Sequence, residues 1–154
     1  MKKIIIIYLF SLLLQSCWYV PMYANNQKLD FYIEEIIFDD GDKDLSLYIK
    51  NYLNAYYKPN GNNKYKINTL IEYTKKSASN SLTGDTVEYD LLTQVKFIIT
   101  SEEFKEELII TERFKMKNFS DEFEELQYEK TIKQNMARLI TSKLLTQMSR
   151  FDVN

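Results

Sequence analysis

The chain of 154 residues contains no histidine and a single cysteine, Cys17. Without histidine there can be no imidazole general base and no histidine metal ligand. One cysteine cannot form a disulfide within the chain. With only 3 glycines, the sequence also has no glycine-rich phosphate loop and no nucleotide-binding fingerprint. These absences predict a protein that is not an enzyme and that carries no metal and no other cofactor.

Charge and aromatic content indicate which classes of protein remain possible. It has 20 basic and 22 acidic residues, so it lacks the strong positive field that nucleic-acid binding requires, and we expect no nucleic-acid partner. It also contains 12 tyrosines and 9 phenylalanines but only 2 prolines. Such a sequence is too aromatic and too poor in chain breakers to be disordered. We therefore expect a folded domain.

The N-terminal residues have the pattern of an export signal. Met1-Lys2-Lys3 is positively charged, and an unbroken apolar run from Ile4 to Leu14 follows it. This order is typical of a secretory signal peptide. The apolar run is shorter than the roughly 20 residues that a membrane-spanning helix needs. Residues 1–16 are therefore predicted to be a lipoprotein signal peptide.

The residues around Cys17 resemble the lipobox of bacterial lipoproteins. Leu14-Gln15-Ser16-Cys17 has leucine three positions before the cysteine and a small residue directly before it. The resemblance implies that Cys17 is the first mature residue and carries a diacylglyceryl group and an amide-linked acyl chain such as palmitate. More than one acyl chain gives stable membrane anchoring. We expect residues 17–30 to form a lipidated tether and residues 31–154 to form one domain.

The spacing of apolar residues divides that domain into strands and helices. Alternation of apolar and polar residues predicts four strands, at Phe31 to Phe38, Lys66 to Thr74, Val87 to Thr100, and Phe104 to Met116. Apolar residues three and four positions apart predict one helix from Asp44 to about Tyr57 and a second helix that begins at Ser120 as its N-cap. The predicted order is β-α-β-β-β-α.

Each predicted helix has one apolar stripe, so each can cover the same sheet. The stripes contain Leu45, Tyr48, Ile49, Tyr52 and Leu53 in the first helix and Ile132, Met136, Leu139 and Ile140 in the second, with Lys133 placed elsewhere. The sequence therefore predicts an α+β fold, in which two helices pack on one face of a four-stranded, mostly antiparallel sheet.

A polar segment from Lys75 to Asp85 separates two of the predicted strands. It is rich in serine, asparagine and threonine and is longer than a tight hairpin needs, so we interpret it as an exposed loop. Such a loop is either a mobile linker or an element that contacts a partner. We take Lys75, Lys76, Asn80 and Thr83 as candidate partner contacts.

The residues after the lipobox resemble the opening of the LPS-assembly lipoprotein family, LptE. The matching segment is Cys17-Trp18-Tyr19-Val20-Pro21-Met22-Tyr23, and the predicted order of strands and helices agrees with that family. The resemblance implies a non-enzymatic lipoprotein at the periplasmic face of the outer membrane of a Gram-negative bacterium. It would occupy the β-barrel of its partner LptD and assist lipopolysaccharide into the outer leaflet.

Contact with lipopolysaccharide, which the resemblance also implies, would require cations for its phosphates. Arg113, Lys115 and Lys117 alternate along the last predicted strand, opposite its apolar face, and Lys96 is a further candidate beside them. The alternative is that these residues only solvate an exposed strand.

Two other kinds of function fit the same features. One is a lipoprotein subunit of another outer-membrane assembly complex, for barrel or secretin assembly. The other is a periplasmic lipoprotein that binds a small ligand on its sheet.

Overall fold

The computed structural model describes residues 31–39, 41–54, 56, 63–80, 82 and 84–151. The predicted signal peptide, Cys17 and the tether lie outside the described residues, and so does Thr83.

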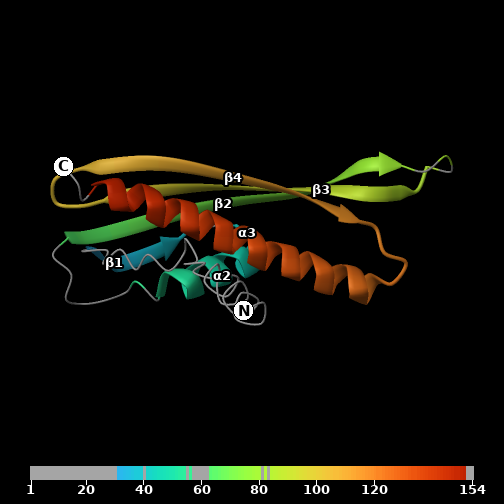
Figure 1. Ribbon diagram of the computed structural model, residues 1–154, viewed down its shortest axis with the longest axis horizontal. Helices are drawn as coiled ribbons and strands as arrows, with labels where there is room; N and C mark the ends of the chain where they lie inside the picture. The colour runs from blue at the N-terminus through green and yellow to red at the C-terminus, as the bar shows by residue number, and fades with distance from the viewer. Residues whose placement is uncertain are drawn as a thin grey trace, which may run out of the picture.

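A four-stranded sheet and two helices make up the described domain (Figure 1). Along the chain they are β1 (Phe31–Phe38), α2 (Lys43–Asn54), β2 (Asn63–Asn80), β3 (Thr86–Thr100), β4 (Lys105–Lys117) and α3 (Glu122–Phe151). The strands lie in the order β1-β2-β3-β4, with β1 parallel to β2 and the other neighbours antiparallel. This arrangement confirms the predicted α+β fold and its element order.

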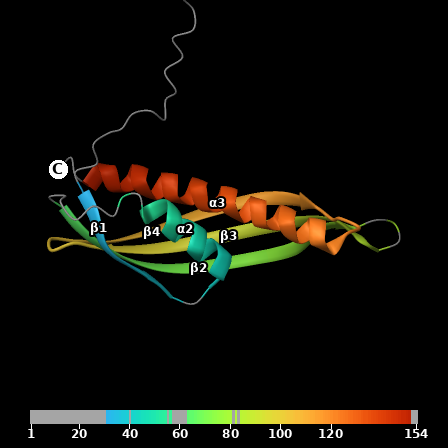
Figure 2. The ribbon, with the colours of Figure 1, turned by 90° about the horizontal axis from the view of Figure 1, so that it is seen from below.

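Both helices lie on one face of the sheet, which we call the inner face (Figure 2). The core joins side chains from both helices with the odd-numbered side chains of β3; its fully buried members include Leu45, Ile49, Leu53, Met136 and Ile140 together with Leu91, Val95, Phe97 and Ile99. Burial of these apolar side chains is the main favourable contribution to folding. Within the described residues no helix covers the opposite face, which we call the outer face.

An aspartate caps each helix. The backbone N–H of Leu45 donates to Asp42 Oδ1 over 2.9 Å, so α2 begins one residue before the predicted Asp44. At α3, the N–H groups of Phe123 and Glu124 donate to Asp121 Oδ1 over 2.8 and 3.0 Å. The prediction of Ser120 as the cap was therefore wrong by one residue. Asp121 fits because its carboxylate satisfies two free N–H groups and also places negative charge at the helix N-terminus.

The hairpin between β2 and β3 differs most from the prediction. β2 continues through Lys75 and Lys76 to Asn80, paired with β3, and residues 81–85 connect the two strands. The polar segment was misread as a loop because ladder hydrogen bonds join backbone groups and do not require apolar side chains. Two register shifts occur near Ser77 and Ser79, and Gly84 turns the chain with a φ of 91°. The hairpin extends beyond the N-terminal end of α3 (Figure 1).

Two predicted core residues are partly exposed. Leu139 was placed on the sheet-facing stripe of α3, but 37% of its surface is accessible, and Tyr52 of α2 is 38% accessible. The buried stripe of α3 runs instead through Lys133, Ala137 and Thr141 beside Met136 and Ile140. Because Ala137 and Thr141 face the core, Leu139 lies on the flank of the helix.

Within the described residues, no helix has both the length and the apolar character that crossing a membrane requires.

Candidate functional site

The candidate site is the outer face of the sheet near the β2–β3 hairpin, which we call the distal end. Lys76 of β2 lies opposite Asp90 of β3, and Asp90 lies opposite Lys115 of β4. Arg113 and Lys117 flank Lys115 on the same face, because residues two apart in a strand point in the same direction. The fold thus brings together Lys76, Arg113, Lys115 and Lys117, which we call the distal basic patch.

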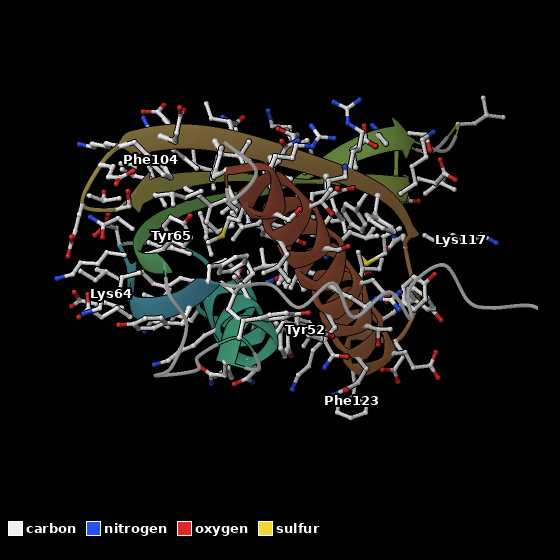
Figure 3. All side chains as sticks on the ribbon, turned by 60° about the vertical axis from the view of Figure 1, so that its left-hand side comes forward. Tyr52, Lys64, Tyr65, Phe104, Lys117 and Phe123 are labelled. Atoms are coloured by element: carbon white, nitrogen blue, oxygen red, sulfur yellow. The ribbon has the colours of Figure 1, made fainter. Side chains whose placement is uncertain are left out.

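The cations of the distal basic patch are weakly compensated. Lys115 Nζ lies 3.9 Å from Glu88 Oε2, and both side chains are exposed. Such an exposed ion pair contributes little to stability. Within the described residues, Lys76, Arg113 and Lys117 have no ion pair. In Figure 3 the side chain of Lys117 points away from the body of the domain. The N–H donors of these side chains are therefore available to an anionic group. Hydrogen bonds between charged partners are stronger than those between neutral ones.

Lys96 does not belong to this patch. It lies opposite Ile109, four residues along β4 from Arg113, which corresponds to about 14 Å along an antiparallel strand. Its ammonium is also engaged, because Lys96 Nζ lies 2.7 Å from Glu107 Oε1. The expectation that Lys96 stands beside Arg113, Lys115 and Lys117 was wrong.

Lys75 points to the inner face and takes part in a cluster of charges beneath the sheet. Its Nζ lies 2.7 Å from Glu125 Oε1 and 2.9 Å from Glu129 Oε2, both on α3. Tyr73, two residues earlier on β2, donates from its hydroxyl to Glu129 Oε1 over 2.8 Å. Lys75 therefore ties β2 to the N-terminal half of α3, and its ammonium is engaged within the domain.

A second lysine extends the cluster to α2. Lys133 Nζ lies 2.7 Å from Oδ2 of Asp42, the residue that caps α2, and 3.6 Å from Glu129 Oε1. Lys133 Nζ also makes a cation–π contact, 4.3 Å from the ring centre of Tyr73. Lys75 Nζ makes a similar contact, 4.4 Å from the ring centre of Tyr89. We call Asp42, Tyr73, Lys75, Glu125, Glu129 and Lys133 the inner charge cluster. This cluster was not predicted from the sequence, although Glu129 and Lys133 have the spacing of a helical ion pair.

Burial and hydrogen bonding shift the pKa values in this cluster. Burial raises the pKa of Tyr73, and the hydrogen bond to Glu129 raises it further. Burial acts to lower the pKa of Lys75, but its bonds to Glu125 and Glu129 outweigh this effect and raise the pKa. Burial likewise acts to raise the pKa of Glu129, but the bonds from Lys75 and Tyr73 lower it overall. The hydrogen bond from Lys75 is the main reason why the pKa of Glu125 is lowered. At neutral pH Glu125, Glu129 and Lys75 are therefore charged, and Tyr73 is neutral.

The remaining candidate is Asn80, which lies at the end of β2 and is exposed; its Oδ1 accepts a hydrogen bond from Ser77 Oγ over 2.7 Å. The described residues contain no group of three His, Cys, Asp or Glu side chains that could hold a metal ion. The distal basic patch offers a ligand the N–H donors of Lys76, Arg113, Lys115 and Lys117.

Comparison with known proteins identifies the fold. No family model and no curated protein matches the sequence. Among solved structures, the crystal structure of rare lipoprotein B from Shewanella oneidensis matches with a TM-score of 0.59 at 16% identity, covering 78% of this chain and 97% of that one. A minor lipoprotein from Acinetobacter baumannii matches with a TM-score of 0.55 at 19% identity, over 78% of this chain and 95% of that one. An uncharacterized lipoprotein B from Nitrosomonas europaea matches with a TM-score of 0.54 at 14% identity, over 80% of this chain and 88% of that one. The chain therefore has the α+β fold of these three lipoproteins, over nearly their whole length.

Proposed function

We propose that this chain is a non-enzymatic outer-membrane lipoprotein of the LptE type, which occupies the barrel of LptD and assists lipopolysaccharide into the outer leaflet. The observation that carries the proposal is the fold match to lipoproteins, which spans 97% of the Shewanella oneidensis protein. The lipobox at Cys17 and the LptE-like segment that follows it support the same conclusion from the sequence.

Anchoring would come from Cys17. The signal pattern before it and the absence of a second cysteine both fit a lipid attachment site. The anchor would hold the domain at the periplasmic face of the outer membrane, with residues 17–30 as the tether.

Within a barrel, the two faces of the sheet would have separate roles. The inner face is committed to the helices and the core. The outer face carries mostly polar and charged side chains at alternate positions of β2, β3 and β4, which suits a water-filled lumen. The distal basic patch on that face would bind the phosphates of lipopolysaccharide.

A pull-down of the tagged full chain from detergent-solubilised outer membrane tests the proposal. We expect LptD among the recovered proteins. A Cys17→Ala chain with the same tag serves as the control, because it should be released from the membrane while the domain beyond residue 30 stays intact. Mass spectrometry of the wild-type chain should find Cys17 at the N-terminus with attached lipid.

Other results of the pull-down would replace the proposal. Recovery of a different barrel or secretin complex without LptD would make the chain a subunit of that complex. Recovery of no protein partner would favour a lipoprotein that binds a small ligand on its own.

A further inference from the structure

The solvent-facing sides of α2 and α3 form one surface, which we call the helical face. The two helices lie side by side on the inner face of the sheet and pack against each other (Figure 2). Their buried stripes are directed at the sheet, so the opposite side of each helix faces solvent. The helical face contains the exposed side chains of Lys43, Leu47, Lys50 and Asn54 on α2 and of Lys130, Thr131, Gln134, Arg138 and Ser142 on α3.

The charge of the helical face is almost entirely positive. Its cations are Lys43, Lys50, Lys130 and Arg138. Within the described residues none of the three lysines has an ion pair, and Arg138 makes a single long hydrogen bond of 3.4 Å to a neighbouring asparagine. A surface that is charged for solubility normally mixes both signs. In α2, however, the one acid is Asp44, and residues 130–151 of α3 contain none, although the chain as a whole has a net charge of −2.

The helix dipoles do not explain these cations. A cation is favoured in the last turn of a helix and disfavoured in the first. Lys43 is the first residue of α2, and the last turn of that helix has no basic residue. Lys130 and Arg138 lie well before the last turn of α3, which ends at Phe151. A partner of opposite charge accounts for this distribution.

The neutral side chains of the helical face suit a protein partner better than a membrane surface. Thr131, Gln134 and Ser142 place hydroxyl and amide groups between the cations, and serine and threonine are weaker helix formers than the alanine, glutamate or lysine of most solvated helices. Such groups can exchange water for hydrogen bonds to a partner. A helix that lies on a membrane needs a broad apolar face, whereas Leu47 is the one large apolar residue of the helical face.

We propose that the helical face docks against an acidic stretch of the lumen wall of the barrel partner. Carboxylates of the wall accept hydrogen bonds from the four cations, and the hydroxyl and amide groups between them pair with other polar groups of the wall. The outer face of the sheet is then directed toward the open part of the lumen. This inference rests on the proposed function, because it takes a barrel as the partner.

Charge reversal on the helical face tests the docking. In the tagged full chain, Lys50→Glu combined with Arg138→Glu reverses one cation on each helix, and we call this variant the helical-face pair. Recovery of LptD from detergent-solubilised outer membrane should fall about tenfold, because like charges then face each other across the contact. Lys50→Arg combined with Arg138→Lys keeps both charges, so its recovery of LptD should stay close to the wild-type level.

Lys64→Glu combined with Lys105→Glu is the matched control. It changes the net charge by the same amount, and both lysines are exposed on strands, outside the helical face. This control should recover LptD as well as the wild type does. Thermal melting of every variant checks that the fold is retained.

Photo-crosslinking reports the contact without a change in charge. A benzoylphenylalanine at Gln134 replaces an exposed amide of the helical face, and one at Asn68 replaces an exposed amide on the outer face of β2. The residue at position 134 should cross-link to LptD, and the residue at position 68 should do so much less.

The possible failures of the docking and of the proposed function give different results. The docking is overturned if the wild type recovers LptD and the helical-face pair recovers it equally well, or if the helical-face pair and the matched control lose recovery equally. Stronger cross-linking from Asn68 than from Gln134 would place the wall against the outer face of the sheet. A wild-type chain that recovers no barrel contradicts the proposed function and this inference together. If the Cys17→Ala chain sediments with vesicles of phosphatidylethanolamine and phosphatidylglycerol, and the helical-face pair abolishes this, an anionic membrane surface replaces the wall as the partner.

Discussion

The residues of the inner charge cluster hold a part of α3 that apolar packing does not. The buried side chains of α3 begin at Ile132. In its first turns Phe123 and Leu126 are largely exposed, and Tyr128 is half-exposed with its ring against Phe119. Glu125 and Glu129, which bind Lys75, are the contacts that join these turns to β2. The first turns of α3, before Ile132, therefore depend mainly on ionic and hydrogen-bonded contacts for their position.

Replacing Glu129 by Gln should destabilise the domain in a pH-dependent way. The substitution removes the charge that binds Lys75 and lies near Lys133, and we expect a loss of about 1.5 to 3 kcal/mol in the free energy of unfolding at neutral pH. Because the folded-state pKa of Glu129 is lowered, its stabilisation is present above its ordinary value of 4.5 and is lost as the pH falls through the folded pKa. The difference between wild type and variant should therefore shrink in acid. Urea unfolding at a series of pH values measures this.

Glu124→Gln is the control for that experiment, because Glu124 lies in the same part of α3 but is exposed. Its effect on the free energy of unfolding should be small. A constant difference between Glu129→Gln and wild type from neutral pH to acid would contradict the assignment of charge as the stabilising feature.

At the scale of elements, simple periodicity predicted most of the fold. Alternation identified the buried face of β3 through Leu91, Val95, Phe97 and Ile99, since a half-buried strand requires that pattern. The same signal failed for the distal part of β2, where Lys75 and Lys76 lie in a strand that extends past the core. No apolar alternation is needed there, because the ladder with β3 holds the backbone.

The faces of α3 could be predicted only in part, for a similar reason. Hydropathy placed Leu139 inside and Lys133 outside, yet Lys133 is buried and Leu139 is not. The long aliphatic stem of a lysine can be buried when its ammonium finds a carboxylate, here Asp42, which is far away in the sequence. Likewise, alternation along the sequence predicted that Arg113, Lys115 and Lys117 share one face of β4. Their proximity to Lys76 depends on how β2, β3 and β4 are aligned, and that alignment cannot be predicted from any one strand.

The packing of α3 can be tested with two adjacent residues. Ile140 is fully buried and Leu139 is 37% exposed. Ile140→Ala should reduce the free energy of unfolding by about 2 to 5 kcal/mol, because it leaves a cavity in the core. Leu139→Ala should cost less than about 1 kcal/mol, because much of that side chain already contacts water. Chemical denaturation of both variants decides the orientation, and equal losses would show that the helix is rotated toward Leu139.

At the scale of the whole molecule, charge is distributed unevenly over an elongated sheet. The chain has a net charge of −2, but the distal end of the outer face carries Lys76, Arg113, Lys115 and Lys117 against Asp90 and Glu88. At the opposite end, Lys66 lies within 4 Å of both Glu34 and Glu35. An anionic ligand is therefore attracted to one end of the molecule, although the chain as a whole is acidic.

This asymmetry predicts where lipopolysaccharide binds under the proposed function. Lys76→Glu combined with Lys117→Glu reverses two cations of the distal basic patch, while Lys64→Glu with Lys105→Glu makes the same change in charge at the other end of β2 and β4. Figure 3 shows Lys64 and Lys117 at opposite ends of the domain. We expect the distal pair to weaken binding of purified lipopolysaccharide about three- to tenfold, since exposed charges each contribute modestly. The proximal pair should change it little. Both variants have the same net charge, so equal losses of affinity would mean that binding depends on overall charge and not on the distal basic patch. A loss of affinity that is confined to the distal pair and disappears in high salt would locate the phosphates at the distal basic patch.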